Sequence, residues 1–446
     1  MTHTASTPTH AEMLVDGHRI LPELLADIAA AKHFVHVSMF LFFRDPIGQD
    51  VAAVLCERAR AGVKVRVLLN VEKTSMGDPF STGEKRMMTH DPAVDYDPLD
   101  VKPMCEAMTA AGCEVVDTNI DYDAVPKIRS ARLLSKAAQI REAIAVDDLH
   151  VDHRKIVVID GTVAYCGGAN IGAQYMHHLP FDHEKGARTE GDERKAAGLP
   201  EPWWKWHDSL TRFEGPIAGD IDVHFRERWL LDGGNEIATA AAPMPTPRPS
   251  RGSPIREARV VCNEPDDSPN GVRELYVKLI GEARRSIFIE NPYLYQPAIV
   301  DALLAAKTAR PELAVTLVLP AGRHNDSSFS QDAQEHNYAA FLECGIAVHE
   351  YENHFNHLKI AVFDERWSIH GSANLNCRSL EDDKDFELVV LVDDEPFARW
   401  VLENVCDMDL RRARRIGDED LHGSIAAFRR RIRDPRTLAL LAKRML

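Results

Sequence analysis

Two short segments of the sequence place a histidine and a lysine two residues apart and follow them with an aspartate. Residues 153–160 read HRKIVVID and residues 357–364 read HLKIAVFD, so both fit the pattern H-x-K-x-x-x-x-D. The apolar residues after each lysine predict a strand, and alternate side chains of a strand point to the same face. Each segment therefore presents one imidazole and one ammonium group together: His153 with Lys155, and His357 with Lys359.

A second similarity follows both segments. The tetrapeptide GGAN ends at Asn170 and GSAN ends at Asn374, and in each half 17 residues separate this asparagine from the histidine. The small residues, among them Gly168, allow the backbone to approach closely. Ser372 and the two asparagines can donate hydrogen bonds to an anion. Two such coincidences in one chain indicate an internal repeat that carries the functional residues.

The aspartates that close the two segments have a different predicted role. Asp160 and Asp364 end the apolar runs beside predicted turns. Their distance along the strand is wrong for joining the histidines around one substrate group, since each residue of a strand advances about 3.3 Å. We interpret both as structural charge partners.

The chemistry that the histidines and lysines favour is the cleavage of one phosphodiester. A phosphoryl group between two partly shielded ammonium groups is stabilised by roughly several kcal/mol at an effective dielectric near 20. One histidine can attack phosphorus to form a phosphohistidine, while the other protonates the leaving alcohol and then deprotonates the incoming one. This chemistry requires no cofactor and no metal ion. We interpret His177, His178 and His183 as parts of a polar loop, because their spacing fits no standard metal site.

The elements around the repeat follow the same order in both halves. Each half opens with a helix, a strand, a second helix and a second strand, which predicts an α/β fold with buried, largely parallel strands. Irregular insertions lengthen the first half, and we expect them to shape the substrate entrance. The predicted divisions are a first half at residues 13–235, a linker at 236–255, a second half at 256–395 and a C-terminal helical extension at 396–446.

Composition narrows the range of functions. The chain has 446 residues, a formal net charge of −16 and 45% hydrophobic residues, which excludes disorder as the main state. Such a negative charge also argues against a generic nucleic-acid binder. The eight cysteines form no C-x-x-C pair, and the N-terminus resembles no signal peptide. These features predict a cytoplasmic location, with peripheral contact at the inner membrane surface left open.

The doubled H-x-K-x-x-x-x-D with G-G/S-x-N resembles the phospholipase D superfamily, and within it the bacterial cardiolipin synthases and related phosphatidyltransferases. The resemblance covers most of residues 13–395 and includes WHDSLTRF and NPYLYQPAIVDALLAA. It implies two α-β-α sandwich halves related by a pseudo-twofold axis, with the active site at their interface. It also implies a phosphatidyltransferase that works through a phosphohistidine intermediate.

The resemblance further implies a role for each catalytic residue. His153 would be the nucleophile and His357 the general acid and base. An acidic residue in the strand after each motif would orient a histidine, which assigns this role to Asp208 and Glu387. A buried ion pair is the alternative interpretation of these two acids.

Several alternatives remain open at this point. The first is a phospholipase D-type hydrolase, in which water replaces the alcohol as acceptor of the phosphatidyl group. A nuclease is less favoured because of the acidic charge, and a lipid-binding protein without activity is the non-enzymatic alternative. The expected partners are a phospholipid substrate and an alcohol or water acceptor. Because both motifs lie in one chain, a monomer is sufficient for the active site.

Overall fold

The computed structural model describes nine segments of the chain. The long insertions that the sequence predicts around the first motif lie outside these segments, as do His177, His178 and His183 and most of the predicted linker. The described residues are 9–71, 100–118, 151–176, 206–237, 252–264, 269–322, 324–325, 328–382 and 384–421.

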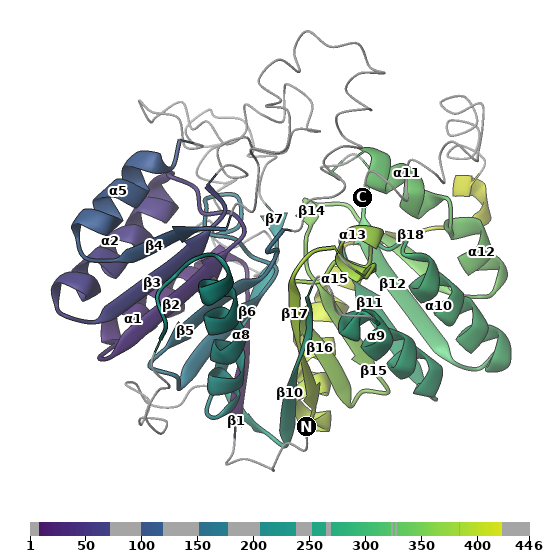
Figure 1. Cartoon of the computed structure of the whole chain (residues 1–446). Helices are drawn as coiled ribbons and strands as arrows, with labels where there is room; N and C mark the ends of the chain where they lie inside the picture. The colour runs from purple at the N-terminus through teal and green to yellow at the C-terminus, as the bar shows by residue number, and fades with distance from the viewer. Residues whose placement is uncertain are drawn as a thin grey trace, which may run out of the picture.

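The first half is built on a mixed sheet of eight strands (Figure 1). In spatial order these are β4 (Glu114–Asp117), β3 (Lys64–Leu69), β2 (Phe34–Met39), β5 (Lys155–Ile159), β6 (Val163–Gly167), β8 (Ser209–Glu214), β1 (Thr9–Val15) and β9 (Ser253–Ile255). Its helices are α1 (Gly17–Ala30), α2 (Pro46–Arg60), α5 (Lys102–Ala110) and α8 (Ile217–Leu231).

The second half has a sheet of the same size. In spatial order its strands are β10 (Glu257–Asn263), β17 (Glu387–Asp393), β16 (Trp367–Gly371), β15 (Ile360–Phe363), β11 (Ser286–Glu290), β12 (Ala314–Pro320), β13 (Ala347–Tyr351) and β18 (Ala413–Arg415). Its helices are α9 (Gly271–Glu282), α10 (Pro297–Ala309), α11 (Ser328–Glu335), α12 (Tyr338–Glu343), α13 (Cys377–Leu380), α14 (Glu395–Val401), the π-helix η5 (Leu402–Cys406) and α15 (Asp407–Leu410).

Seven strands follow the same order in both sheets, as the internal repeat predicts. The order β4-β3-β2-β5-β6-β8-β1 corresponds to β13-β12-β11-β15-β16-β17-β10. The prediction of largely parallel strands is wrong, because β2, β3 and β4 are parallel but β5, β6, β8 and β1 join antiparallel. The cause is that short hairpins, rather than helical crossovers, connect β5 to β6 and β15 to β16.

Local signals in the sequence explain where the outer helices begin. The Asp45 side chain accepts a hydrogen bond from the Gly48 amide at 2.9 Å, and Pro46 occupies the first turn of α2. At the matching helix of the second half, α10, the Gln296 side chain accepts from the Ile299 amide at 3.0 Å, and Pro297 follows it. N-cap acceptors and proline at the first turn both favour a helix start.

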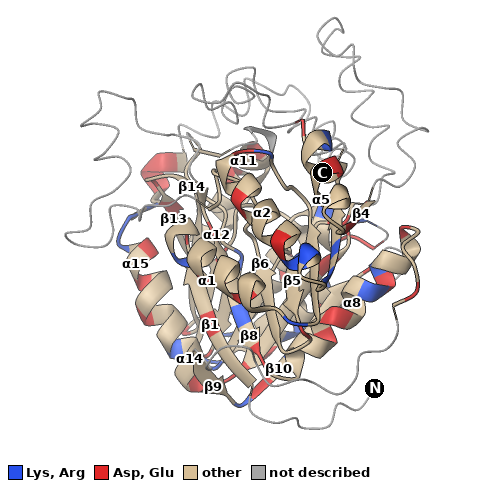
Figure 2. Ribbon diagram, turned by 90° about the vertical axis from the view of Figure 1, so that its left-hand side faces the viewer, with Lys and Arg blue, Asp and Glu red and all other residues tan. Residues whose placement is uncertain are grey.

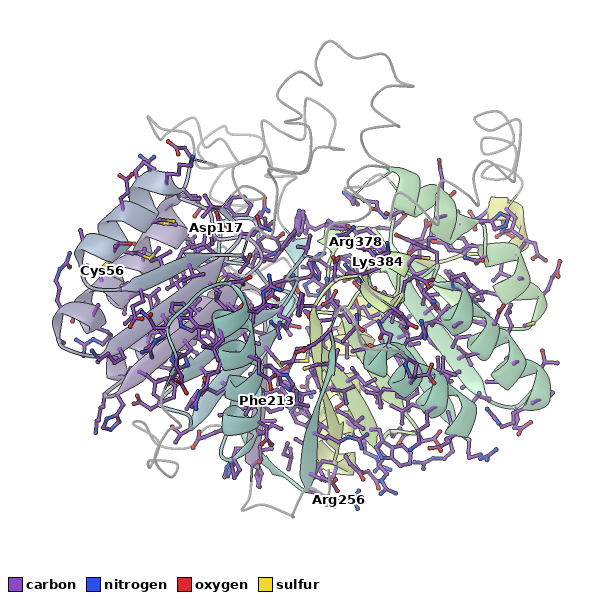
Figure 3. The ribbon with its side chains drawn as sticks, viewed as in Figure 1. Cys56, Asp117, Phe213, Arg256, Arg378 and Lys384 are labelled. Atoms are coloured by element: carbon purple, nitrogen blue, oxygen red, sulfur yellow. The ribbon has the colours of Figure 1, made fainter. Side chains whose placement is uncertain are left out.

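Three large apolar clusters form the core of the protein. One lies between the first sheet and α1, α2 and α5, and a second lies between the other sheet and α9, α10 and α12. The third joins the facing sides of the two sheets with α8 and α14. Phe213 of β8 belongs to this interface cluster and lies between the halves (Figure 3). Because the interface is a continuous apolar core, the two halves are fixed against each other.

The predicted boundaries differ from the structure at three places. The first sheet already begins at Thr9, and β9 of the predicted linker pairs with β1. The predicted helical extension also contains a strand, since β18 pairs with the edge strand β13. Residues beyond 421, including the Arg-rich stretch 428–433, lie outside the described segments. No helix in the described segments combines the length and apolarity needed to cross a bilayer.

Candidate active site

Both predicted histidines lie at the interface, each at the start of a central strand. His153 lies two residues before Lys155, the first residue of β5, and His357 lies between β15 and the two-residue strand β14 (Phe355–Asn356). The apolar residues that follow are buried in both strands. The strands therefore enter the core while the histidines remain at its edge, beside β7 (Trp206–His207) and β14 (Figure 1).

The backbone pairs each histidine with the opposite half. The His153 amide donates to the Phe386 carbonyl at 3.0 Å, and the His357 amide donates to the His207 carbonyl at 2.8 Å. β14 and β7 form a separate two-stranded parallel sheet across the interface. Phe386 and His207 directly precede the two acids predicted to orient the histidines. The acids are thus carried to the histidine of the other half.

The side chains complete this crosswise arrangement. His153 Nδ1 lies 2.9 Å from Glu387 Oε1, and His357 Nδ1 lies 2.6 Å from Asp208 Oδ2. A carboxylate beside Nδ1 accepts the proton there and leaves Nε2 as the reactive nitrogen. Both acids are buried, and each contact with a histidine also has the geometry of a buried ion pair, so the alternative interpretation stays open. Each half supplies the acid that orients the other half's histidine.

The two lysines are buried beside their histidines. Lys155 Nζ donates to the His153 carbonyl at 2.5 Å, and Lys359 Nζ donates to the His357 carbonyl at 2.9 Å. Lys359 Nζ also lies 3.1 Å from His357 Nε2. Burial lowers the pKa of Lys155 to about 7, with the charge of Lys359 adding to this shift and Glu387 opposing it. The charges of the two lysines act on each other, and an anion near both would relieve this repulsion.

The two orienting acids have opposite electrostatic environments. Burial raises the pKa of Asp208 to about 7, although Lys359 and the Ser209 amide act against the shift. Burial alone would also raise the pKa of Glu387. The charges of His153 and Lys155 and the Ser372 hydroxyl outweigh burial, so the pKa of Glu387 is lowered. Glu387 is therefore the firmly ionised acid, which favours His153 as a neutral base with a free Nε2.

The imidazoles themselves are held in the neutral form. Burial lowers the pKa of His153 against the opposing charge of Glu387. Burial, and then the charges of Lys359 and Lys155, lower the pKa of His357 well below its usual value. An anionic phosphodiester between the lysines would offset these positive charges and so raise the proton affinity of His357, as a general acid requires.

The residues Gly168 and Ser372, predicted to contact the phosphate, instead support the two acids. The Ser372 hydroxyl donates to Glu387 Oε2, and the Ser379 hydroxyl donates to Glu387 Oε1 at 2.5 Å. A phosphate role for Ser372 does not fit, because its proton is already donated. At the matching position, a Cβ added to Gly168 would lie 2.3 Å from Asp208 Oδ1. The small residues of the two tetrapeptides therefore provide space or a hydrogen bond for an acid.

This contact leads to a prediction for Gly168→Ala. The added methyl group displaces Asp208, and we expect kcat to fall at least tenfold, about 1.4 kcal/mol in the activation barrier, because His357 loses its oriented partner. Steady-state kinetics with any accepted phosphodiester measures the change. Gly219→Ala is the matched control, since no atom lies within 4 Å of the added Cβ and α8 gains a better helix former. Equal activity of both variants would contradict this role of Gly168.

The two asparagines of the tetrapeptides lie in different environments. Asn170 Oδ1 accepts a hydrogen bond from the Leu41 amide at 2.9 Å, so its carbonyl oxygen supports the loop after β2. Asn374 Oδ1 is buried and accepts no hydrogen bond from the described residues. The amide of Asn170 is thus held in one orientation, whereas phosphate contact by either asparagine stays a prediction.

The two motif aspartates contact backbone amides rather than charged side chains. Asp160 accepts from the amides of residues 32–34 at 2.8–2.9 Å, and Asp364 accepts from those of residues 284–286 at 2.6–3.0 Å. Both have positive φ, 51° and 53°, a conformation that aspartate tolerates at tight turns. These backbone contacts support a structural role for both aspartates, whereas the sequence predicted charged partners.

Aromatic side chains that lie outside the two sequence motifs pack around the histidines. The His357 ring lies 4.8 Å from Trp206, 5.5 Å from Phe355 and 5.8 Å from Tyr175, measured between ring centroids. Phe40 packs against His153 at 5.0 Å. The tryptophan-rich segment before Asp208 was the available signal. These rings make one side of the site apolar.

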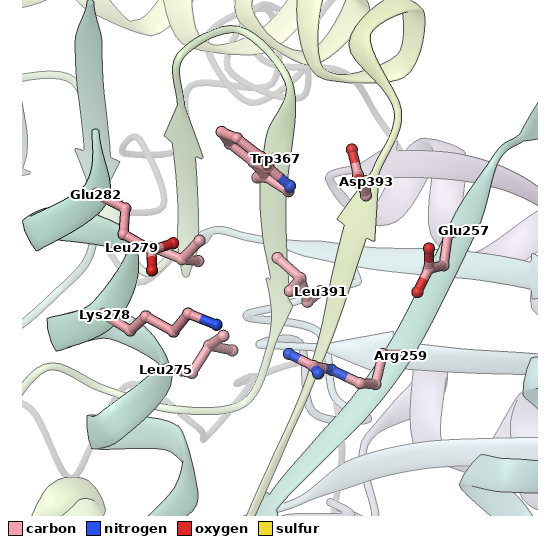
Figure 4. A pocket seen from close by; sticks show the side chains of 9 residues that line it. All are labelled: Glu257, Arg259, Leu275, Lys278, Leu279, Glu282, Trp367, Leu391 and Asp393. Atoms are coloured by element: carbon pink, nitrogen blue, oxygen red, sulfur yellow. The ribbon is translucent and has the colours of Figure 1, made fainter. Parts of the chain in front are cut away.

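Other features of the described surface lie apart from this site. A shallow pocket is formed by α9 and the strands β10, β16 and β17, and none of its lining residues belongs to the histidine site (Figure 4). Acidic and basic residues alternate along α8 and α14 (Figure 2). This mixture of charges differs from the basic stripe of a nucleic-acid-binding surface.

Two similar halves, with a paired histidine and lysine from each at the interface and crossed acids behind them, match the arrangement expected of the phospholipase D superfamily. The family model described as "Cardiolipin synthase, PLD-like domain" matches residues 24–192 and 276–408, which is more than half of the chain, and the chain belongs to this family. The predicted superfamily is thereby confirmed.

Individual relatives agree with this assignment. Cardiolipin synthase 1 of Bacillus anthracis is 26% identical over 381 residues, which cover 84% of this chain and 62% of the relative. Probable cardiolipin synthase YwiE of Bacillus subtilis is 25% identical over 413 residues, 92% of this chain and 68% of the relative. The chain thus spans about 62% of the length of the first of these relatives.

Solved structures share the two-half fold. The crystal structure of phosphatidylserine synthase from Haemophilus influenzae Rd KW20 superposes with a TM-score of 0.62 at 14% identity and covers 98% of this chain and 97% of its own. Polyphosphate kinase from Porphyromonas gingivalis superposes with a TM-score of 0.51 at 13% identity, covering 92% of this chain and 49% of the kinase. At these identities the likeness concerns the fold, and it confirms the predicted α/β architecture.

Proposed function

We propose that this chain is a phosphatidyltransferase of cardiolipin-synthase type. The observation that carries the proposal is the pairing of His153 with Glu387 and of His357 with Asp208 across one interface, with a buried lysine beside each histidine. The family assignment supports a phospholipid as substrate. The aromatic side of the site, formed by Trp206 and its neighbours, supports an apolar substrate.

The proposed reaction has two steps that use the same groups in opposite directions. His153 Nε2 attacks phosphorus and the bond to the headgroup oxygen breaks, while His357 gives that oxygen a proton. The hydroxyl of a second lipid or small alcohol then loses its proton to His357 and attacks the phosphohistidine, which restores both imidazoles. Lys155 and Lys359 stabilise the charge on the phosphoryl oxygens in both steps.

A product assay tests the function. We expect purified protein incubated with phosphatidylglycerol vesicles to form cardiolipin or a lipid with an exchanged headgroup, detected by mass spectrometry. Water can replace the alcohol at the same phosphohistidine, so the hydrolase is the alternative that the assay must separate. Phosphatidic acid as the sole product would overturn the transferase and favour the hydrolase. Cleavage of single-stranded DNA with no lipid product would favour the nuclease.

The pKa of Lys155 leads to a pH prediction. Because the free-enzyme pKa is about 7, the ammonium form that binds phosphate is present below that pH and is lost above it. We expect kcat/KM to fall up to tenfold per pH unit above about pH 7. The Lys155→Arg side chain stays charged at alkaline pH. The fall in kcat/KM of this variant should therefore begin at a higher pH, even if its maximal kcat/KM is lower. If kcat/KM of Lys155→Arg fell over the same pH range as in the wild type, a group other than Lys155 would be responsible for the fall.

We propose that the protein contacts the inner membrane surface peripherally. Arg414 of the C-terminal segment is paired with Glu350, Glu352 and Asp420, so its positive charge is largely balanced within the protein. Two apolar side chains at the end of α8 support contact instead, since Leu230 is 48% and Leu231 63% exposed. Flotation of the protein with phosphatidylglycerol vesicles, compared with a Leu231→Ser variant, tests this contact.

A further inference from the structure

A cluster of one histidine and two carboxylates lies behind the active site. His207 ends β7, Glu290 ends β11 and Asp409 belongs to α15, so three elements from both halves contribute. One ligand atom of each residue lies within 4.8 Å of those of the other two. The three residues are far apart in the chain, and the sequence carries no motif that connects them.

Each of the two carboxylates in this cluster has one buried oxygen that lacks the hydrogen bond a buried acid normally accepts. Glu290 is 0% and Asp409 2% exposed. Glu290 Oε1 accepts from Asn356 Nδ2 at 2.5 Å, but Glu290 Oε2 and Asp409 Oδ2 accept no hydrogen bond from the described residues. Leaving a buried acceptor unpaired costs about 1–3 kcal/mol, and more for a charged group. Both acids belong to the ligand cluster.

The charges in this region do not balance through the imidazole alone. A third buried carboxylate, Asp16, contacts His207 Nδ1 at 2.9 Å, so three acids surround one histidine. An imidazolium ion contributes a single positive charge. A bound divalent cation would neutralise the remaining carboxylates.

The geometry around His207 is that of a metal-binding histidine. Its Nδ1 faces the Asp16 carboxylate, which leaves Nε2 on the side of the cluster, 3.1 Å from Asp409 Oδ2. Metal-ligating histidines usually donate their other N–H to a carboxylate in this way. The Tyr351 ring stacks on the imidazole at 5.2 Å with an interplanar angle of 6° and holds its orientation.

The matching region of the other half shows how the protein balances such charge without an ion. Phe386 takes the place of His207, and Asp152 takes the place of Asn356. There the Arg154 and Arg228 guanidinium groups lie 5.2 Å and 4.2 Å from the Phe386 ring, and Arg154 binds Asp152 through two nitrogens at 2.9 Å. Arginine side chains thus supply the positive charge in that half.

We propose that His207, Glu290 and Asp409 bind one divalent transition-metal ion of the Zn²⁺ or Mn²⁺ type. One imidazole nitrogen and two carboxylate oxygens suit these ions, and the Asp16 carboxylate orients the histidine from behind. The ion has a structural role: it holds β7 against β11 and α15. Because Asp208 follows β7 and His357 follows β14, it stabilises the strand pair that carries one histidine and its acid. The ion takes no part in the transfer chemistry.

Metal content and thermal stability of the full chain test the site. The protein is stripped with chelator, equilibrated with Zn²⁺, Mn²⁺ or Mg²⁺, and measured by mass spectrometry of the metal and by thermal denaturation. We expect one Zn²⁺ or Mn²⁺ per chain and a Tm that rises with ion concentration. Asp409→Asn and Glu290→Gln keep the shape of the side chains and should each weaken binding at least tenfold.

A control variant and three contrary outcomes make the test decisive. Glu264→Gln alters a second cluster of the same residue types, His224, Glu227 and Glu264, which is partly exposed, and this variant should bind the ion like the wild type. Absence of a bound ion in the wild type would overturn the proposal. So would equal binding by the wild type and both cluster variants. The proposal would also fail if Asp409→Asn had a higher Tm than the wild type and neither protein responded to metal. That result would show that protons shared between the acids, rather than an ion, neutralise the charge of the cluster.

Discussion

Replacing His153 by asparagine is expected to lower turnover by about 10⁴-fold or more and to abolish the covalent phosphoenzyme. Asparagine preserves much of the side-chain volume but has no nitrogen lone pair that can attack phosphorus. The side chain of His153 is 12% exposed, against 6% for His357, and its Nδ1 faces the ionised Glu387. His153 Nε2 is therefore the better-presented nucleophile.

Intact-protein mass spectrometry after an alkaline quench, which preserves phosphohistidine, measures the adduct. A phosphatidyl ester with an activated leaving group removes the need for an acid in the first step, so His357→Asn should then accumulate the adduct that His153→Asn cannot form. His33→Asn, an exposed histidine outside the site, is the control. Adduct in His153→Asn and none in His357→Asn would exchange the two assignments.

Glu387→Gln is expected to slow formation of the phosphoenzyme by about 10³-fold. The glutamine amide can donate to His153 Nδ1, which places the imidazole proton on Nε2 and blocks the attacking lone pair. Because the pairing is crossed, this second-half acid should control the first-half histidine. Rapid-quench measurement of the first step with the activated ester reports this effect separately from later steps.

Asp208→Asn is the matched comparison for this experiment. Asp208 orients His357, whose acid function the activated leaving group does not need, so Asp208→Asn should retain most of the first-step rate and lose the second step. Glu257→Gln, at the edge strand β10 and away from the site, controls for the amide substitution itself. If Asp208→Asn blocked the first step and Glu387→Gln spared it, each acid would act within its own half and the crossed arrangement would be wrong.

The order of the strands agrees with the repeat in the sequence, but their directions do not. The apolar runs of β2 and β3 predict buried strands, and these strands form in the predicted order. The runs after His153 and His357 are equally apolar. They nevertheless join their sheets antiparallel to the neighbouring strands, because each run continues directly into a hairpin at Asp160 or Asp364. Hydrophobic periodicity reports burial and is silent about strand direction.

The sequence by itself was enough to predict which residues carry the chemistry. The spacing of His153, Lys155, His357 and Lys359 is local, and a strand holds such residues on one face whatever surrounds it. The family and the two-half fold could likewise be predicted from the repeated motif, and the comparisons confirm both.

Only the tertiary structure decided which groups act on one another. The pairing of Glu387 with His153, the use of Ser372 for Glu387 rather than for phosphate, and the cluster around His207 all join residues that are distant in the chain. These contacts arise where two separate sheets pack face to face. Packing of this kind depends on the summed burial of many apolar side chains, and no local spacing in the sequence records which polar groups it brings together.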